Sequence, residues 1–148
     1  MTTYQHTQIG KGILVPIIGV ALVNLYFVIR AGATPAAIVP ATVAIVLLLT
    51  LFLFWKLTIS VNSEVCRASF GPGFIYKEIP VNQIERCDPM RVRWWHGWGI
   101  HFTSNGWLYN ISGPHAVIIT LRNGRRLCFG TDEPQELQAA VLRFASAK

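Results

Sequence analysis

The sequence predicts a membrane-spanning α-helical hairpin joined to a mainly-β domain that ends in one α-helix. Residues 12–29 and 36–55 are two apolar stretches without a charged side chain, and no acidic residue occurs before Glu64. From residue 57 onward, apolar and polar residues alternate along short runs, which is the period of a half-buried strand. The last residues of the chain return to a helical period.

Both apolar stretches have the length that a transmembrane helix needs, about 20 residues. We expect the spans at residues 12–29 and 35–56, because Thr34 and Pro35 suit an N-cap and a first helical position. A cleaved signal peptide is disfavoured because the first apolar run is longer than the usual core of such peptides. The chain then divides into an N-terminal tail (1–11), a hairpin (12–56) and a β domain (57–148).

Basic residues predict how the hairpin sits in the membrane. Lys11 and Lys56 flank the side that the two chain ends share, whereas Arg30 is alone in the connecting loop. Positive charge concentrates on cytosolic loops, so both termini are expected in the cytosol. Tyr26 with Arg30, and Trp55 with Lys56, stand where interfacial anchors stand.

Small and polar residues in the spans predict how the helices pack. Ala37, Ala41 and Ala44 form a stripe at helical spacing, and small residues let helices approach closely in lipid. The stripe serves packing either within the hairpin or between protomers. Asn24 is expected to make an interhelical hydrogen bond rather than a transport site, because no ionisable residue accompanies it.

The region after residue 56 predicts seven or eight antiparallel strands. Asn-Gly occurs twice between alternating apolar runs, at 105–106 and 123–124, and this dipeptide is a strong signal for a tight β-hairpin. The expected runs are 57–61, 64–70, 74–79, 81–87, 98–103, 107–111, 116–121 and 125–129.

A C-terminal helix is expected at 132–146, with Thr131 or Asp132 as its cap. Leu137, Val141 and Phe144 then share one apolar face. The strands would form a sandwich or a partly open barrel, and the helix would cover one open end.

The stretch GWGIHFTSNGWLYNISGPHAVIITLRNGRRLCFGTDEP, residues 97–134, resembles bacterial pleckstrin-homology-like (PH-like) domains that are appended to membrane hairpins. The resemblance covers roughly residues 57–147 and the hairpin before them. It implies a PH-like sandwich capped by one helix and a location in a bacterial inner membrane. It implies no particular activity, because fold alone does not give function.

The most unusual segment is 91–98, which combines two arginines with three tryptophans. Arginine pairs with phosphate oxygens, and tryptophan prefers the bilayer interface. This segment is expected to touch lipid head groups or a partner helix; alternatively, its tryptophans fold back on the sandwich. The candidate binding residues are Arg91, Arg93, Trp94, Trp95, His96 and Trp98.

A second basic group, Arg122, Arg125 and Arg126, surrounds the turn at 123–124. It is a candidate contact for a membrane or a phosphorylated head group, and otherwise a solvated hairpin tip. The sequence does not show whether this tip and the 91–98 segment face the same way.

Several classes of function are disfavoured. Cys66, Cys87 and Cys128 lack metal-site spacing and are expected as unpaired core thiols. The histidines are not spaced as metal ligands, and no nucleotide-binding or nucleophile motif is present, so we expect no metal, no cofactor and no enzymatic activity. The net charge of +6 is not clustered as a nucleic-acid partner would require.

The expected function is therefore that of a non-enzymatic binding module held at the cytoplasmic membrane face. Its partner would be a membrane protein or an anionic lipid head group, and tethering to the bilayer would raise the effective concentration. The alternative is a structural subunit of a membrane homo-oligomer or of a larger membrane complex.

Overall fold

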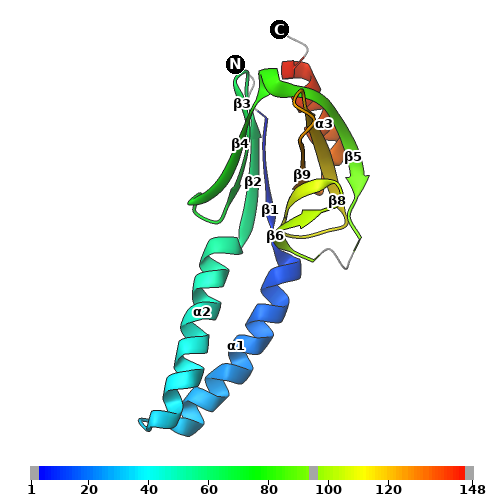
Figure 1. The fold of residues 1–148 in the computed structure, drawn as a ribbon. Helices are drawn as coiled ribbons and strands as arrows, with labels where there is room; N and C mark the ends of the chain where they lie inside the picture. The colour runs from blue at the N-terminus through cyan, green and yellow to red at the C-terminus, as the bar shows by residue number, and fades with distance from the viewer. Residues whose placement is uncertain (1–3, 94–96, 146–148) are drawn as a thin grey trace.

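The computed structural model describes residues 4–93 and 97–145. A helical hairpin projects from one end of a two-sheet β domain, and the first strand begins and the last helix ends at the opposite end of that domain (Figure 1). In chain order the elements are β1 (Tyr4–Ile9), α1 (Lys11–Ala31), η1 (Pro35–Ala37), α2 (Ile38–Phe54), β2 (Lys56–Val61), β3 (Val65–Phe70), β4 (Ile75–Pro80), η2 (Val81–Gln83), β5 (Ile84–Arg91), β6 (Gly99–Thr103), β7 (Gly106–Asn110), β8 (His115–Leu121), β9 (Arg126–Gly130) and α3 (Pro134–Ala145).

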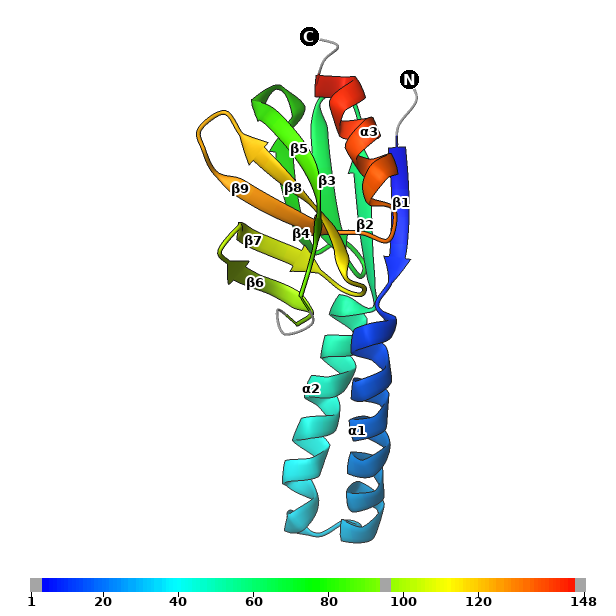
Figure 2. The same cartoon turned by 90° about the vertical axis from the view of Figure 1, so that its right-hand side faces the viewer.

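The two N-terminal helices run side by side in opposite directions (Figure 2). Spans of 21 residues (Lys11–Ala31) and 20 residues (Pro35–Phe54) are long and apolar enough to cross a membrane. Neither α1 nor α2 contains a buried residue. The rest of the protein therefore leaves their apolar surfaces uncovered, which suits helices whose solvent is lipid.

Packing within the hairpin uses the predicted alanine stripe but not Gly19 of the first helix. Ala37, Ala41 and Ala44 are half-buried, whereas Gly19 is exposed, and a Cβ added at Gly19 would meet no atom within 4 Å. The side-chain amide of Asn24 donates a hydrogen bond to the Pro40 carbonyl oxygen at 2.7 Å. The interhelical hydrogen bond expected of Asn24 is thus confirmed.

An unexpected strand precedes the hairpin. Residues 4–9, which the sequence places in an N-terminal tail, form β1 and pair antiparallel with β2 from Tyr4↔Val61 to Ile9↔Lys56. The Gly10 N–H also donates to the Trp55 carbonyl at 2.9 Å. The whole helical hairpin is therefore inserted between two adjacent, paired strands, as a very long connection between them.

The strands form two sheets, in the orders β1-β2-β3-β4 and β5-β8-β9-β7-β6. The two hairpins predicted at Asn-Gly are present as β6–β7 and β8–β9. The prediction of purely antiparallel pairing is wrong in one place, because β7 and β9 pair in parallel. The strand order places β8 between β5 and β9. Strand β7 therefore pairs with β9 instead of with β8, the strand that follows it in the chain.

Several boundaries also differ from those expected, and α3 begins at Pro134 instead of at residue 132. Lys56 begins β2 instead of ending the second helix, and residues 81–83 form the short helix η2 before β5 begins at Ile84.

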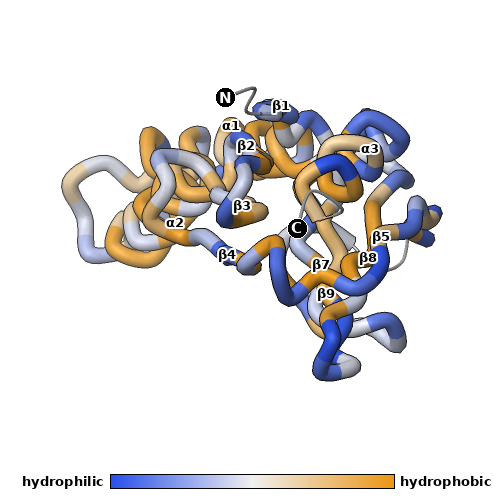
Figure 3. Tube along the Cα trace, turned by 90° about the horizontal axis from the view of Figure 1, so that it is seen from above, coloured by the Kyte–Doolittle hydropathy of each residue, from blue (hydrophilic) through white to orange (hydrophobic). Residues whose placement is uncertain are grey.

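The two sheets diverge, and they do not close into a barrel. Seen from above, α3 lies on the side where β1 and β2 approach β5, and the opposite side, between β4 and the β7–β9 region, is left uncovered (Figure 3). Leu137 and Val141 of α3 are fully buried between the sheets, which confirms that the helix uses its apolar face to cover one open side. The Thr131 hydroxyl accepts a hydrogen bond from the Glu133 N–H at 3.1 Å just before α3.

Candidate functional site

The two basic groups singled out in the sequence lie at opposite ends of the β domain. β5 and β8 pair from Ile84↔Leu121 to Arg91↔His115, so Arg122 follows one end of this pair and the 91–98 segment follows the other. At about 3.3 Å per residue, these ends are about 23 Å apart. Figure 2 shows the β8–β9 turn at the end of the domain away from the helices. The two groups cannot form one contact surface.

The described residues of the 91–98 segment, 91–93 and 97–98, lie at the hairpin end. Arg91 and Arg93 are exposed, and Val92 between them is buried, with its N–H donating to the Pro114 carbonyl at 2.6 Å. Trp98 lies directly on α1, because a Cβ at Gly12 would come within 2.7 Å of its indole ring. Three candidates from this segment, Trp94, Trp95 and His96, lie outside the described residues.

The β8–β9 turn divides the second basic group. Arg125 and Arg126 line an open pocket between the two sheets. Arg122 instead borders a shallower depression beside α3. The turn is held by the Asn123 side-chain oxygen, which accepts a hydrogen bond from the Arg125 N–H at 3.0 Å.

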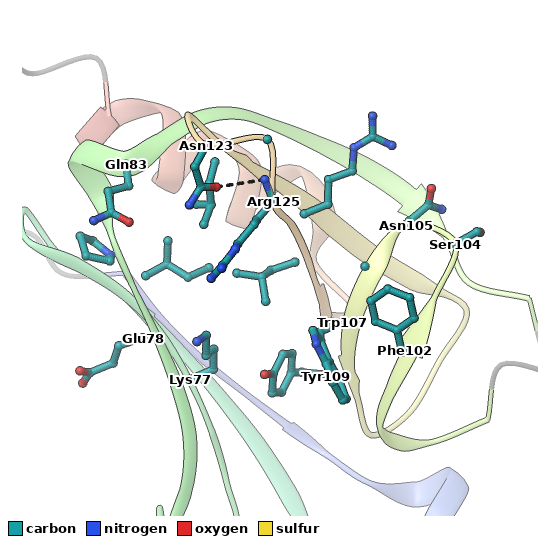
Figure 4. A pocket seen from close by; sticks show the side chains of 17 residues that line it. Lys77, Glu78, Gln83, Phe102, Ser104, Asn105, Trp107, Tyr109, Asn123 and Arg125 are labelled. Carbon is teal, nitrogen blue, oxygen red and sulfur yellow. Dashed lines mark hydrogen bonds between the residues drawn. The ribbon is translucent and has the colours of Figure 1, made fainter.

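The pocket has a volume of about 760 Å³ and lies on the side of the sandwich that α3 leaves uncovered (Figure 4). One wall is the edge strand β4, and the other is formed by the β6–β7 and β8–β9 hairpins. The lining residues are Lys77, Glu78, Ile79, Pro80, Gln83, Phe102, Ser104, Asn105, Gly106, Trp107, Tyr109, Leu121, Asn123, Gly124, Arg125, Arg126 and Leu127.

Positive charge dominates this lining. Three of its residues are basic, Lys77, Arg125 and Arg126, and no ion pair within 4.0 Å joins them to a carboxylate among residues 4–93 and 97–145. The acidic lining residue, Glu78, is already paired with Arg67 at 3.2 Å. Figure 4 shows the Arg125 side chain extending from its turn into the gap between the sheets.

Aromatic side chains share this lining. Phe102 is 71% exposed and Trp107 48% exposed, although they contact each other edge to face at 5.7 Å between ring centroids. Tyr109 packs behind them on Phe129, and burial raises the pKa of its hydroxyl, so that group stays neutral at physiological pH. A lining that combines exposed aromatic rings with three cations suits a ligand that is anionic and partly apolar.

Sequence reasoning missed most of this pocket. Lys77, Phe102 and Trp107 fall in the strands that the sequence predicts, but they are not among its candidate binding residues. The available signal was the Asn-Gly turn at 105–106, which places Phe102 opposite Trp107 in the register of β6 and β7.

None of the three thiols lines the pocket. Cys66, Cys87 and Cys128 are all buried and unpaired, as expected of core thiols. Burial, together with the nearby Asp88 carboxylate, raises the pKa of Cys87 to about 12. Burial also raises the pKa of Cys128 to about 11, although Arg126 opposes the shift. Such thiols are protonated at neutral pH, and only the thiolate is a nucleophile.

Among the described residues, no group of three or more His, Cys, Asp and Glu side chains is placed to hold a metal ion.

The predicted membrane anchors occupy the two ends of the hairpin. The Lys56 ammonium lies 4.7 Å from the centroid of the Trp55 ring, at the end that meets the β domain. Tyr26 and Arg30 are exposed near the connecting loop, where Tyr26 contacts Phe27 edge to face.

No protein-family model, curated protein or solved structure matches this chain. The PH-like resemblance therefore stays a prediction from the sequence pattern.

Proposed function

We propose that this chain is a non-enzymatic integral membrane protein whose β domain presents a pocket for an anionic group at the cytoplasmic face. The observation that carries the proposal is a pocket that combines exposed aromatic rings with three basic side chains, none of which is ion-paired within the described part of the chain. The anionic group would belong to a membrane lipid or to an acidic segment of a membrane protein.

The chemistry of the lining supports binding. Arg125 and Arg126 supply planar guanidinium groups that hold a carboxylate or phosphate by two parallel hydrogen bonds. Lys77 adds a point charge from the opposite wall. The pocket volume of about 760 Å³ lies within the usual range of ligand sites, and sites of this kind combine an apolar lining with a few polar groups.

The membrane topology is part of the proposal. Lys11 and Lys56 lie at the hairpin end that meets the β domain, and Arg30 lies at the other end. The excess of positive charge on the β-domain side supports a cytosolic β domain and cytosolic termini. Attachment to the bilayer would keep a weakly binding pocket close to its ligand.

A PH-like identity of the β domain also belongs to this proposal. A four-stranded antiparallel sheet, a second sheet facing it and a C-terminal helix between them support it. The parallel pair β7–β9 is a departure from the antiparallel sandwich that the resemblance implies.

The test is photocrosslinking of the full-length protein in native membranes, followed by mass spectrometry of attached proteins and lipids. The triple variant Lys77→Ala, Arg125→Ala, Arg126→Ala is compared with the native protein. The matched control is Arg122→Ala, which removes an exposed arginine from the same turn but from outside the pocket. The proposal expects the triple variant alone to lose its anionic partner. A partner retained by a folded triple variant would contradict it.

The same experiment tests the alternative of a homo-oligomer. The half-buried alanine stripe lies within the hairpin, so contacts between copies would have to use other surfaces, such as the outer strand edges. Crosslinked dimers that persist at low expression in the triple variant would favour this alternative.

A further inference from the structure

Two exposed aromatic side chains flank the junction between the hairpin and the β domain. Phe74, in the β3–β4 turn, is 73% exposed, and Trp98, just before β6, is 48% exposed. Isolated apolar residues on a surface are common, but these two lie beside the helix ends that join the β domain.

Phe74 lies level with the end of α2. Its turn begins at Gly71, whose N–H donates to the Lys56 carbonyl at 2.8 Å. A Cβ at Gly71 would come within 2.5 Å of the Leu53 carbonyl oxygen, so the turn rests directly on the last turn of α2. Figure 1 shows the turn between β3 and β4 beside the upper end of α2.

Trp98 lies at the corresponding level of the other helix. Its indole covers Gly12, the second residue of α1. Phe74 therefore flanks the hairpin on the α2 side, and Trp98 flanks it on the α1 side.

The apolar spans fix where the membrane surface would meet these residues. α2 ends at Phe54, and Trp55 with Lys56 follows at once, so the edge of the hydrocarbon lies near this point if the hairpin crosses a bilayer. The head-group layer beyond it is about 5–8 Å thick on each side. Phe74 and Trp98, at the level of the helix ends, fall within that layer.

We propose that the base of the β domain is a lipid-contact surface, in which Phe74 and Trp98 insert into the head-group layer on two flanks of the hairpin. The occupant is the membrane that the hairpin itself spans, because the apolar surface of α1 and α2 continues onto these two side chains. This inference requires a membrane-spanning hairpin and is independent of any ligand in the pocket.

The contact also sets the height of the pocket. Lys77 pairs with Ala68, which pairs with Ile59, three residues along β2 from Lys56. Lys77 is then about 10 Å above Lys56, the first residue of β2, along the strand. With its base seated on the lipid, the domain holds this part of the pocket close above the head groups.

The native thiols allow a direct test. All three are buried, so a cysteine introduced at an exposed position can be labelled selectively with a polarity-sensitive fluorophore. Phe74→Cys and Trp98→Cys probe the two flanks, and Pro72→Cys, exposed in the same turn as Phe74, is a second probe there. Arg122→Cys, at the far end of the domain, is the matched control, and the unsubstituted protein is the labelling blank.

The full-length variants are reconstituted in phosphatidylcholine vesicles that contain a lipid with a nitroxide on its head group. We expect a blue-shifted emission and several-fold stronger quenching at positions 74 and 98 than at position 122. Quenching at 74 and 72 no stronger than at 122 would overturn the proposal. Quenching on one flank alone would overturn the two-sided contact. Loss of the pocket's ligand in the crosslinking experiment would leave this result unchanged.

Discussion

His6, in the first strand, contacts Asp132, which precedes the last helix, with 2.6 Å between its Nε2 and the carboxylate oxygen. Its other ring nitrogen lies 3.1 Å from a carboxylate oxygen of Glu133. Both contacts are hydrogen bonds only when both ring nitrogens carry protons. This pair of contacts ties β1 to the start of α3, at the side of the sandwich that α3 covers.

Replacing His6 by Ala should weaken this attachment. The pair is partly exposed to solvent, so we expect a loss of about 0.5–1 kcal/mol in the free energy of unfolding. Gln5→Ala, on the exposed face of the same strand, is the matched control. Thermal unfolding in detergent measures both, and equal midpoints for the two variants would show that the contact contributes nothing.

Gly71→Ala should destabilise the junction between the hairpin and the β domain. Gly71 has φ +49°, and its added Cβ would lie 2.5 Å from a backbone oxygen of α2. The left-handed backbone alone costs about 1–2 kcal/mol for a residue with a Cβ, and the clash adds to this cost.

Gly73→Ala separates the two causes, because Gly73 has φ +100° but no atom within 4 Å of its added Cβ. Chemical unfolding should show a larger loss for Gly71→Ala than for Gly73→Ala. An equal loss would place the cost in the backbone conformation alone.

Alkaline pH should lower the stability of the β domain. Burial raises the pKa of the Cys66 thiol, with a smaller contribution from Cys87, and raises that of Cys87 to about 12 from an ordinary value of 9.0. Above pH 9 the unfolded chain loses thiol protons that the folded chain keeps, so the free energy of unfolding falls as the pH rises toward 12.

Unfolding measured in steps from pH 8 to pH 11 checks this expectation. Cys87→Ala should flatten the decline, because it removes one of the shifted groups. A slope that the substitution leaves unchanged would assign the decline to other groups, such as Tyr109, whose pKa burial also raises.

Asn24→Ala should loosen the hairpin. Its hydrogen bond to the Pro40 carbonyl joins the two helices, and such bonds between membrane helices contribute about 0.6 kcal/mol on average. Thr42→Ala is the control, because the Thr42 hydroxyl donates to the Ile38 carbonyl within its own helix. Disulfide crosslinking between cysteines placed on α1 and α2 measures the effect, and equal rates in both variants would contradict it.

Local patterns predicted most of the elements. The alternating runs after residue 56 gave the eight strands that follow the hairpin, and each Asn-Gly pair marked a real turn. The strand β1 is not predicted because its sequence, YQHTQI, is mostly polar. Its partner strand also lies beyond the hairpin, where the Thr7 and Thr58 hydroxyls form a hydrogen bond. Pairing at that separation leaves no local signal.

The candidate site was harder to predict than the fold. Lys77, Trp107 and Arg125 lie on three separate segments. They line one pocket because the two sheets diverge on the side away from α3 and leave a gap there. The basic residues at the β8–β9 turn are evident from composition, but the sequence does not show that Arg125 and Arg126 line the pocket and that Arg122 does not. Such a division depends on sheet geometry, which residue spacing along one strand does not encode.

The insertion of the hairpin between β1 and β2 has a mechanical consequence. Gly10 alone separates β1 from α1, and Trp55 alone separates α2 from β2. A domain on one flexible tether would spin freely about the membrane normal, but two short connections through paired strands resist torque. Rotation of the helices would turn the whole β domain with them. In a hairpin that spans a membrane, the helices would therefore set the direction in which the pocket opens. A protein that binds the helices would thereby also orient the pocket.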